Sequence, residues 1–290
     1  MPSQNVQWFP GHMARARRLL QESLPLVDAV VELRDARAPE SSRNPEIGAI
    51  IGSKPRIVLL NKSDLADDGA TRRWLAFLRR ESPALAVDCR SSRGLSRFAP
   101  ALQEALRETI DKNTARGMAQ KPLRLMVVGI PNVGKSSLIN RLAGGARAQT
   151  ADRPGVTRHN QWYPAGHVRD IPIELLDTPG VLWPKFDDPA VGEKLAFLGS
   201  VKDEVFDAET LALRLLEVLR VGYPTRLTER YRLEAPALAL PPWELLEAVA
   251  QRRGMLLPGS VPDSQRAAAM LLDELRTGRL GKLTLDETPR

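Results

Sequence analysis

The stretch GIPNVGKS, from Gly129 to Ser136, determines the fold that we predict for this 290-residue chain. It matches the pattern GxxxxGK[ST] of a phosphate-binding loop, in which glycines let the backbone approach phosphate oxygens at the start of a helix. The apolar run Leu123–Val128 before it is typical of a buried parallel strand, and residues 137–142 after it indicate a helix. The pattern therefore predicts a strand, a loop and a helix that together hold a phosphate chain.

Two further motifs follow apolar runs of the same kind. DTPG, at 177–180, comes after the run 171–176, and NKSD, at 61–64, comes after the run 56–60. Open α/β sheets place their ligands at the carboxyl ends of parallel strands. Because all three motifs stand at strand ends, we expect them to meet at one edge of a sheet. Each motif alone occurs by chance, so the interpretation depends on their conjunction.

The order of these motifs is unusual. In an ordinary GTPase the phosphate loop comes first and the NKxD tetrapeptide near the end, whereas here NKSD stands 68 residues before the phosphate loop. This order indicates a circular permutation. The predicted fold class is α/β: a circularly permuted P-loop GTPase domain, a mostly parallel sheet flanked by helices, followed by a small all-α C-terminal domain.

The phosphate loop and DTPG have defined chemical roles. Lys135 brings positive charge to the β- and γ-phosphates, and the hydroxyl of Ser136 binds Mg²⁺. Asp177 is expected to organise the same metal, while the backbone N–H of Gly180 senses the γ-phosphate. The full set of expected phosphate-binding residues is Asn132, Val133, Gly134, Lys135, Ser136, Ser137 and Gly180.

NKSD predicts specificity for guanine. The carboxylate of Asp64 accepts hydrogen bonds from N1–H and N2–H₂ of guanine, a donor pair that adenine lacks. Asn61 braces the loop, and Lys62 lays its methylene stem along the plane of the base. Ser91 and Ser92 are candidates for supporting guanine O6 through backbone N–H groups, on a weaker signal.

A mobile switch is expected between the phosphate loop and DTPG. Thr157, in the segment 152–157, is the preferred candidate to bind Mg²⁺ only when the γ-phosphate is present, and Thr150 is the competing candidate. After Gly180, Ras-like enzymes carry a glutamine that orients the attacking water. Here Val181 stands in that place, so another residue enters the site or hydrolysis is slow until a partner acts.

His12 is the candidate residue to enter the site in place of the missing glutamine. It lies in the turn Phe9-Pro10-Gly11-His12, ahead of a helix predicted from about residue 13 to residue 23. The structural alternative is that His12 caps this helix or contacts RNA, and the sequence leaves both interpretations open.

The charge of the chain suits a polyanionic partner. The net charge is +7, and residues 1–199 contain 29 Lys and Arg against 21 Asp and Glu, whereas residues 200–290 contain 13 against 14. The basic surface is therefore expected on the nucleotide-binding part. Solvated charged faces without a partner are the alternative, and charge alone does not establish RNA binding.

The composition also limits the cellular locations and the kinds of cross-link that are expected. Cys89 is the only cysteine, which rules out an intramolecular disulfide and a cysteine metal cluster. No apolar stretch approaches the ~20 residues that span a bilayer, and the N-terminus lacks the features of a secretory signal. We expect a cytoplasmic protein without membrane contact, and a monomer.

Three amphipathic segments predict the helices of the C-terminal domain, at 208–220, 241–253 and 264–276. The expected division is a GTPase domain at 1–186, a hinge or linker at 187–206 and a helical domain with RNA contact at 207–290.

The chain resembles the bacterial ribosome biogenesis GTPase A family, a group of circularly permuted GTPases. The resemblance runs nearly end to end and is carried by five segments, WFPGHM at 8–13, DARAP at 35–39, SSRNP at 41–45, PGVT at 154–157 and LWPKF at 182–186. It implies an enzyme that hydrolyses GTP to GDP and phosphate, supports late maturation of the large ribosomal subunit and leaves after hydrolysis stimulated by the particle.

The resemblance also implies residue roles. His12 is the proposed substitute for the missing catalytic glutamine, Asn132 helps to bind K⁺ near the β- and γ-phosphates, and the C-terminal helices contact ribosomal RNA. Two departures stand out: Ser91-Ser92-Arg93 replaces the commoner Ser-Ala-Lys, and the C-terminal domain is nearly neutral. The alternative function is a nucleotide-gated module that binds RNA or the ribosome, with hydrolysis incidental.

Overall fold

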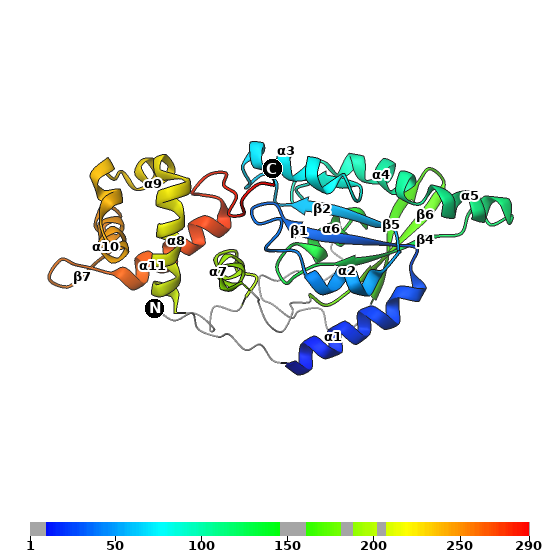
Figure 1. The fold of residues 1–290 in the computed structure, drawn as a ribbon, viewed down its shortest axis with the longest axis horizontal. Helices are drawn as coiled ribbons and strands as arrows, with labels where there is room; N and C mark the ends of the chain where they lie inside the picture. The colour runs from blue at the N-terminus through cyan, green and yellow to red at the C-terminus, as the bar shows by residue number, and fades with distance from the viewer. Residues whose placement is uncertain (1–9, 146–160, 181–187, 202–206, 290) are drawn as a thin grey trace. The chain divides into compact units, whose positions relative to one another are not determined.

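The computed structural model describes residues 10–145, 161–180, 188–201 and 207–289. The chain forms two compact units, one of Met1–Asp187 with Asp286–Arg290 and one of Asp188–Leu285. The first is rich in strands and the second is mainly helical (Figure 1).

A six-stranded sheet forms the centre of the first unit, in the order β3-β2-β1-β4-β6-β5. The strands are β1 (Ala29–Asp35), β2 (Arg56–Asn61), β3 (Ala84–Ala86), β4 (Leu123–Val128), β5 (Gln161–Val168) and β6 (Ile171–Asp177). The pairs from β3 to β6 are parallel, and β5 pairs antiparallel with β6. β1 therefore lies between the strand that leads to NKSD and the strand that leads to the phosphate loop.

Helices lie along both sides of this sheet (Figure 1). They are α1 (Pro10–Ser23), α2 (Pro45–Ile51), α3 (Asp68–Leu78), α4 (Phe98–Ala105), α5 (Arg107–Ala115) and α6 (Lys135–Leu142). Side-chain caps define two of the starts, since Asn44 accepts from the N–H of Glu46 and Asp67 from that of Ala70.

Two apolar clusters fix helices against strands. One joins α1 and α2 to the sheet and consists of Leu20, Val27, Val30, Ile47, Ile51, Met126, Val128 and Leu176. The other joins α3 to β2 and β3 and consists of Ala36, Val58, Leu60, Ala66, Trp74, Leu78 and Ala84. All seven residues of β1 are buried, as is typical of a central strand in a parallel sheet.

The second unit contains α7 (Pro189–Phe197), α8 (Ala208–Gly222), α9 (Pro224–Tyr231), α10 (Pro242–Arg252) and α11 (Ser264–Thr277), with a hairpin of β7 (Leu256–Leu257) and β8 (Val261–Pro262). Its core comes from the leucine faces of α8, α10 and α11. The three predicted helices of this region are confirmed, with ends that differ by one or two residues. No helix in the described ranges has the length and apolarity that crossing a membrane requires.

Three local expectations differ from the structure. The amphipathic pattern of residues 95–109 predicts a single helix, but in the structure it is broken at Leu106, which leaves helical geometry between α4 and α5. The stretch 187–206, predicted as a linker, contains α7, because Asp188 caps its first turn and Pro189 suits the first helical position. Finally, the antiparallel strand β5 was not predicted.

Candidate functional site

The three motifs meet at one edge of the sheet, as predicted from their strand-end positions. β2 ends at Asn61, β4 ends one residue before Gly129, and β6 ends at Asp177. The strand register places Asp177 beside Val127, and Asn61 beside Asp35 at the end of β1. Parallel pairing thus brings together segments that are more than a hundred residues apart in the chain.

Lys135 is buried within the phosphate loop. Its Nζ donates to the carbonyl oxygens of Gly129 at 3.1 Å and Ile130 at 2.9 Å, and only 8% of the residue is exposed. Burial lowers the pKa of Lys135 to about 8, and the charge of Asp177 offsets part of that shift. The ammonium is therefore held where a phosphate chain over the loop would stabilise it.

Asn61 braces two loops at once. Its Nδ2 donates to the carbonyl of Val133 at 2.8 Å, and its Oδ1 accepts from the backbone N–H of Cys89 at 3.0 Å. A Cβ on Gly134 would lie 2.2 Å from this Nδ2, at a φ of +106° that favours glycine. Glycine at 134 is thus what allows the guanine motif to approach the phosphate loop.

Lys62 makes a second brace to the phosphate loop. Its Nζ donates to the carbonyl of Asn132 at 2.8 Å and lies 3.1 Å from Oδ2 of Asp35. Asp35 is a functional candidate that sequence reasoning missed, since its motif served there only as a mark of family resemblance. Its position at the end of the strand beside β2 was the available signal.

The segment with Ser91 and Ser92 is organised by Asp88. The carboxylate of Asp88 accepts from the N–H groups of Arg90 at 2.8 Å and Ser91 at 3.2 Å. Burial raises the pKa of Asp88, but these hydrogen bonds and one from the Ser91 hydroxyl outweigh it and leave the pKa below its ordinary value. The loop follows Cys89, which Asn61 holds, so it adjoins the guanine motif.

Cys89 itself is buried, and burial, together with the charge of Asp88, raises the pKa of its thiol to about 12. It is a packed thiol in the turn that follows β3.

DTPG lies against the phosphate loop. A Cβ on Gly180 would be 2.9 Å from Nζ of Lys135 and equally close to the backbone of Pro131. Thr178 donates from Oγ1 to the carbonyl of Val127 at 2.6 Å, which ties the start of the segment to β4. Glycine at 180 is therefore what allows DTPG to lie this close to the phosphate loop.

The oxygen donors needed for Mg²⁺ are present. Asp177 is buried at the end of β6, and Ser136 and Ser137 lie in the first turn of α6. Within the described ranges, no group of three His, Cys, Asp or Glu forms a protein-only metal site. A carboxylate and a hydroxyl beside a phosphate loop suit Mg²⁺, which takes its remaining ligands from phosphates and water.

Several predicted site residues fall outside the part that can be described. Thr150, Thr157 and Val181 lie outside the described residues. The backbone of His12 lies in the first turn of α1, but its side chain is not among those described. The roles of Asp64, Ser91 and Ser92 toward guanine remain predictions.

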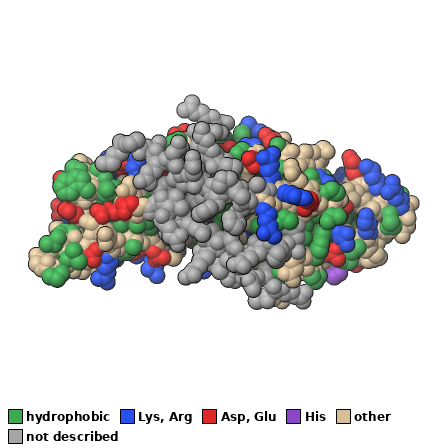
Figure 2. Space-filling model, turned by 90° about the horizontal axis from the view of Figure 1, so that it is seen from below, with side chains coloured by type: hydrophobic (Ala, Val, Ile, Leu, Met, Phe, Trp, Pro, Cys, Tyr) green, Lys and Arg blue, Asp and Glu red, His purple; other side chains and the backbone are tan. Residues whose placement is uncertain are grey.

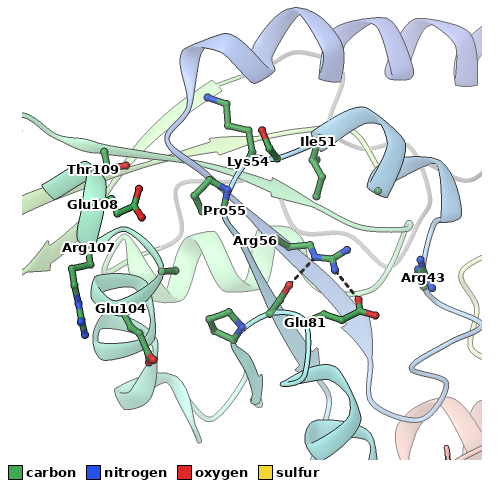
Figure 3. Close-up of a pocket in the computed structure, with 16 residues that line it drawn as sticks. Arg43, Ile51, Lys54, Pro55, Arg56, Glu81, Glu104, Arg107, Glu108 and Thr109 are labelled. Atoms are coloured by element: carbon green, nitrogen blue, oxygen red, sulfur yellow. Dashed lines mark hydrogen bonds and ion pairs between the residues drawn. The ribbon is translucent and has the colours of Figure 1, made fainter. Parts of the chain in front are cut away.

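A large pocket lies away from these motifs (Figure 3). It is lined by residues just before β2 and β3 and by the α4–α5 junction, with Arg56 directed toward Glu81 at 3.6 Å. These segments lead into the amino ends of the strands, so the pocket is separate from the nucleotide edge.

The comparisons with known proteins agree with this geometry. The sequence profile described as "50S ribosome-binding GTPase" matches residues 124–221. Ribosome biogenesis GTPase A of Bacillus cereus is 46% identical over 98% of this chain and 94% of its own, and that of Priestia megaterium is 47% identical over 97% and 96%. The mouse mitochondrial ribosome-associated GTPase 1 is 35% identical over 97% of this chain and 90% of its own.

Two solved structures share the fold. YlqF of Thermotoga maritima bound to GNP has a TM-score of 0.64 at 26% identity, covering 94% of this chain and 98% of that one. The GDP-bound structure of the same name has a TM-score of 0.65 at 27% identity, covering 92% and 98%. The fold and its motif edge therefore define a circularly permuted P-loop GTPase that binds GTP and GDP. Within that class, the chain belongs to the ribosome biogenesis GTPase A family.

Proposed function

We propose that this GTPase is an assembly factor that binds the large ribosomal subunit in the cytoplasm, supports its late maturation and hydrolyses GTP when the particle stimulates it. The observation that carries the proposal is the braced edge where the guanine motif, the phosphate loop and DTPG meet, in a chain whose full-length relatives are named for ribosome biogenesis.

At this edge we assign the base to Asp64, Asn61 and Lys62, with backbone support from Ser91 and Ser92. The phosphates belong to the backbone of residues 132–137, to Lys135 and to the N–H of Gly180. Ser136 and Asp177, with Thr157 in the GTP state, would hold Mg²⁺, which would supply positive charge to the phosphates. Asn132 is the proposed K⁺ ligand.

Hydrolysis needs a group that orients water, and we assign it to His12. This chain has Val181 where Ras-like enzymes have a glutamine after DTPG, and the helix that begins at Pro10 carries His12 in its first turn. In this proposal the particle places His12 and excludes bulk water, so intrinsic turnover is slow.

The basic surplus supports an RNA partner. Residues 1–187 with 286–290 contain 29 Lys and Arg against 21 Asp and Glu, whereas residues 188–285 contain 13 against 14. Figure 2 shows Lys and Arg side chains spread over the GTPase unit on the face in view. We propose that this unit supplies much of the electrostatic attraction to RNA and that the helical unit, 188–285, adds contacts that depend less on charge.

The test is steady-state GTP hydrolysis in K⁺ buffer by the full chain, assumed to be monomeric, with purified large or small ribosomal subunits. Stimulation by large subunits alone supports the proposal, and equal turnover with either subunit or with none counts against it. Replacing K⁺ by Na⁺ in the same assay tests the role of Asn132. Analytical sedimentation of the chain alone in the same buffer checks that it is a monomer.

The alternative is a nucleotide-gated module in which hydrolysis is incidental. His12→Ala separates the two. Loss of particle-stimulated turnover with unchanged GTP affinity supports a catalytic His12. Unchanged turnover and GTP-dependent docking favour the module.

A further inference from the structure

Asp35 ends β1, the strand that separates the two halves of the nucleotide site. β1 pairs with β2 on one side, where Asp35 is in register with Asn61, and with β4 on the other. The carboxyl end of β1 therefore lies between the loop that carries NKSD and the loop that carries the phosphate-binding residues. Neither of those motifs includes Asp35.

The carboxylate of Asp35 is buried and held rigidly. Arg37 donates to Oδ1 from its backbone N–H at 3.0 Å and from Nε at 2.9 Å, and to Oδ2 from Nη2 at 2.8 Å. The backbone N–H of Asp35 donates to Oγ of Ser42 at 2.9 Å, which ties the end of β1 to the turn that follows it. Asp35 and Arg37 are each 1% exposed, so the position of the carboxylate is fixed by its surroundings.

This fixed anion holds Lys62. Oδ2 of Asp35 lies 3.1 Å from Nζ of Lys62, and the same Nζ donates to the carbonyl of Asn132 at 2.8 Å. The ammonium at the end of the Lys62 side chain thus contacts both the last residue of β1 and the phosphate loop. Its methylene stem must cross the space between the guanine loop and those two anchors.

We propose that Asp35 is a positioning residue for guanine nucleotides, which acts by fixing Lys62 so that its stem supports the base and its ammonium braces the phosphate loop. The proposal rests on the proposed role of Lys62 toward guanine. Without the Asp35 carboxylate, the positive charges of Arg37 and Lys62 have no anion between them. They repel each other, so the ammonium of Lys62 moves away from the end of β1.

The charge of Asp35 persists over the working range of pH. Burial raises its pKa, but the charges of Arg37 and Lys62 and the hydrogen bonds from Arg37 outweigh burial and hold the pKa well below its ordinary value. The anchor is therefore permanent in the folded protein.

A double-mutant cycle on the full chain tests the proposal, with GDP affinity as the measured quantity. The variants are Asp35→Asn, Lys62→Met and the two combined. Each single variant is expected to bind GDP roughly tenfold more weakly, and the double variant no more weakly than Lys62→Met alone. Asp35→Asn should thus weaken GDP binding only while Lys62 is present.

Glu32→Gln is the matched control. Glu32 is a buried carboxylate on the same strand that pairs with Arg34 at 2.7 Å and Arg56 at 3.4 Å. It has the same kind of ion pair as Asp35, but its partners are Arg34 and Arg56 rather than Lys62 and the phosphate loop. The control is expected to lower stability toward urea while GDP affinity stays within about twofold of the parent.

Three results overturn the proposal. The first is unchanged GDP affinity in folded Asp35→Asn. The second is additive losses in the cycle, or an equal loss in Glu32→Gln, which makes Asp35 a structural residue only and leaves Lys62 in its guanine role. The third is unchanged affinity in Lys62→Met, which removes the guanine role of Lys62 as well. If Asp35→Asn alone does not fold, the GDP affinity of the double variant is still compared with that of Lys62→Met, because the double variant keeps the net charge of the cluster. Weaker GDP binding by the double variant would then contradict the proposal.

Discussion

The ammonium of Lys135 is buried, and this burial lowers the pKa of Lys135 to about 8. Phosphates favour its charged form, so nucleotide binding raises this pKa. Well below pH 8 the lysine is already protonated, and affinity does not depend on its titration. Above pH 8 the free protein must take up a proton to bind, so affinity falls as pH rises.

We expect calorimetric titration with GDP to show almost no proton uptake through Lys135 at pH 6.5 and roughly three-quarters of a proton at pH 8.5. Buffers of different ionisation enthalpy give the number of protons directly. Lys135→Gln is the control, since it should bind weakly and lose the difference between the two pH values. Equal proton uptake at both values in the parent would contradict the expectation.

Asn61 is a buried amide whose two ends serve different loops, Val133 in the phosphate loop and Cys89 before the Ser91 segment. Asn61→Ala removes both hydrogen bonds, so the carbonyl of Val133 and the N–H of Cys89 lose Asn61 as their partner. We expect a loss of about 1–3 kcal/mol in the free energy of unfolding, together with weaker GDP binding, measured by urea denaturation and by titration.

Asn44→Ala is the comparison for Asn61, because Asn44 is a buried asparagine that caps α2. It should lose about 1 kcal/mol of stability and keep its GDP affinity. If the two variants lose GDP affinity equally, Asn61 has no special role at the site.

At the scale of elements, the phosphate loop and the guanine loop approach each other at Gly134. Gly134→Ala places a methyl group 2.2 Å from Nδ2 of Asn61 in a backbone conformation that alanine avoids. The loops must separate, so we expect GDP binding to weaken by at least tenfold and the protein to remain folded, as checked by titration and circular dichroism.

Gly117→Ala is the matched control for Gly134. Gly117 also has a positive φ, of +72°, but an added Cβ meets nothing within 4 Å. This variant should carry only backbone strain, about 1 kcal/mol, with unchanged GDP affinity. Equal losses of affinity in both variants would show that backbone strain alone, and not the contact with Asn61, is responsible.

The sequence predicted the elements whose signals are local. The strands that lead into NKSD, GIPNVGKS and DTPG are short apolar runs that end at motif residues, so both their burial and their shared edge followed from the pattern. The break at Leu106 was missed because α4 and α5 together keep a helical composition. The contact between Asp35 and Lys62 was missed for a different reason, since it exists only because β1 and β2 are neighbours in the sheet.

At the scale of the whole molecule, the chain passes from the first unit to the second at 187–188 and returns at 285–286. Thr284 is held in the second unit, where its N–H donates to the hydroxyl of Tyr223 at 2.7 Å. Two residues later, Asp286 is held in the first unit. The GTPase unit is therefore completed by residues that follow the entire helical unit in the chain.

Asp286 stabilises the turn after β1 from a position about 245 residues later in sequence. Its Oδ2 accepts from the N–H groups of Glu40 and Ser41, both at 2.8 Å, and its Oδ1 accepts from the hydroxyl of Ser41 at 2.5 Å. Because this turn is buried, Asp286→Ala removes charged hydrogen bonds that water does not fully replace. We expect a loss of about 1–3 kcal/mol in the free energy of the unfolding transition that GDP stabilises, which is the transition of the GTPase unit.

Asp273→Ala is the control. This exposed carboxylate lies 3.9 Å from Arg279, and its removal should leave the free energy of that transition within about 0.5 kcal/mol of the parent. If Asp286→Ala leaves the GDP-sensitive transition unchanged, the Asp286 carboxylate contributes nothing to the stability of the GTPase unit, and the turn after β1 is held by its local hydrogen bonds alone.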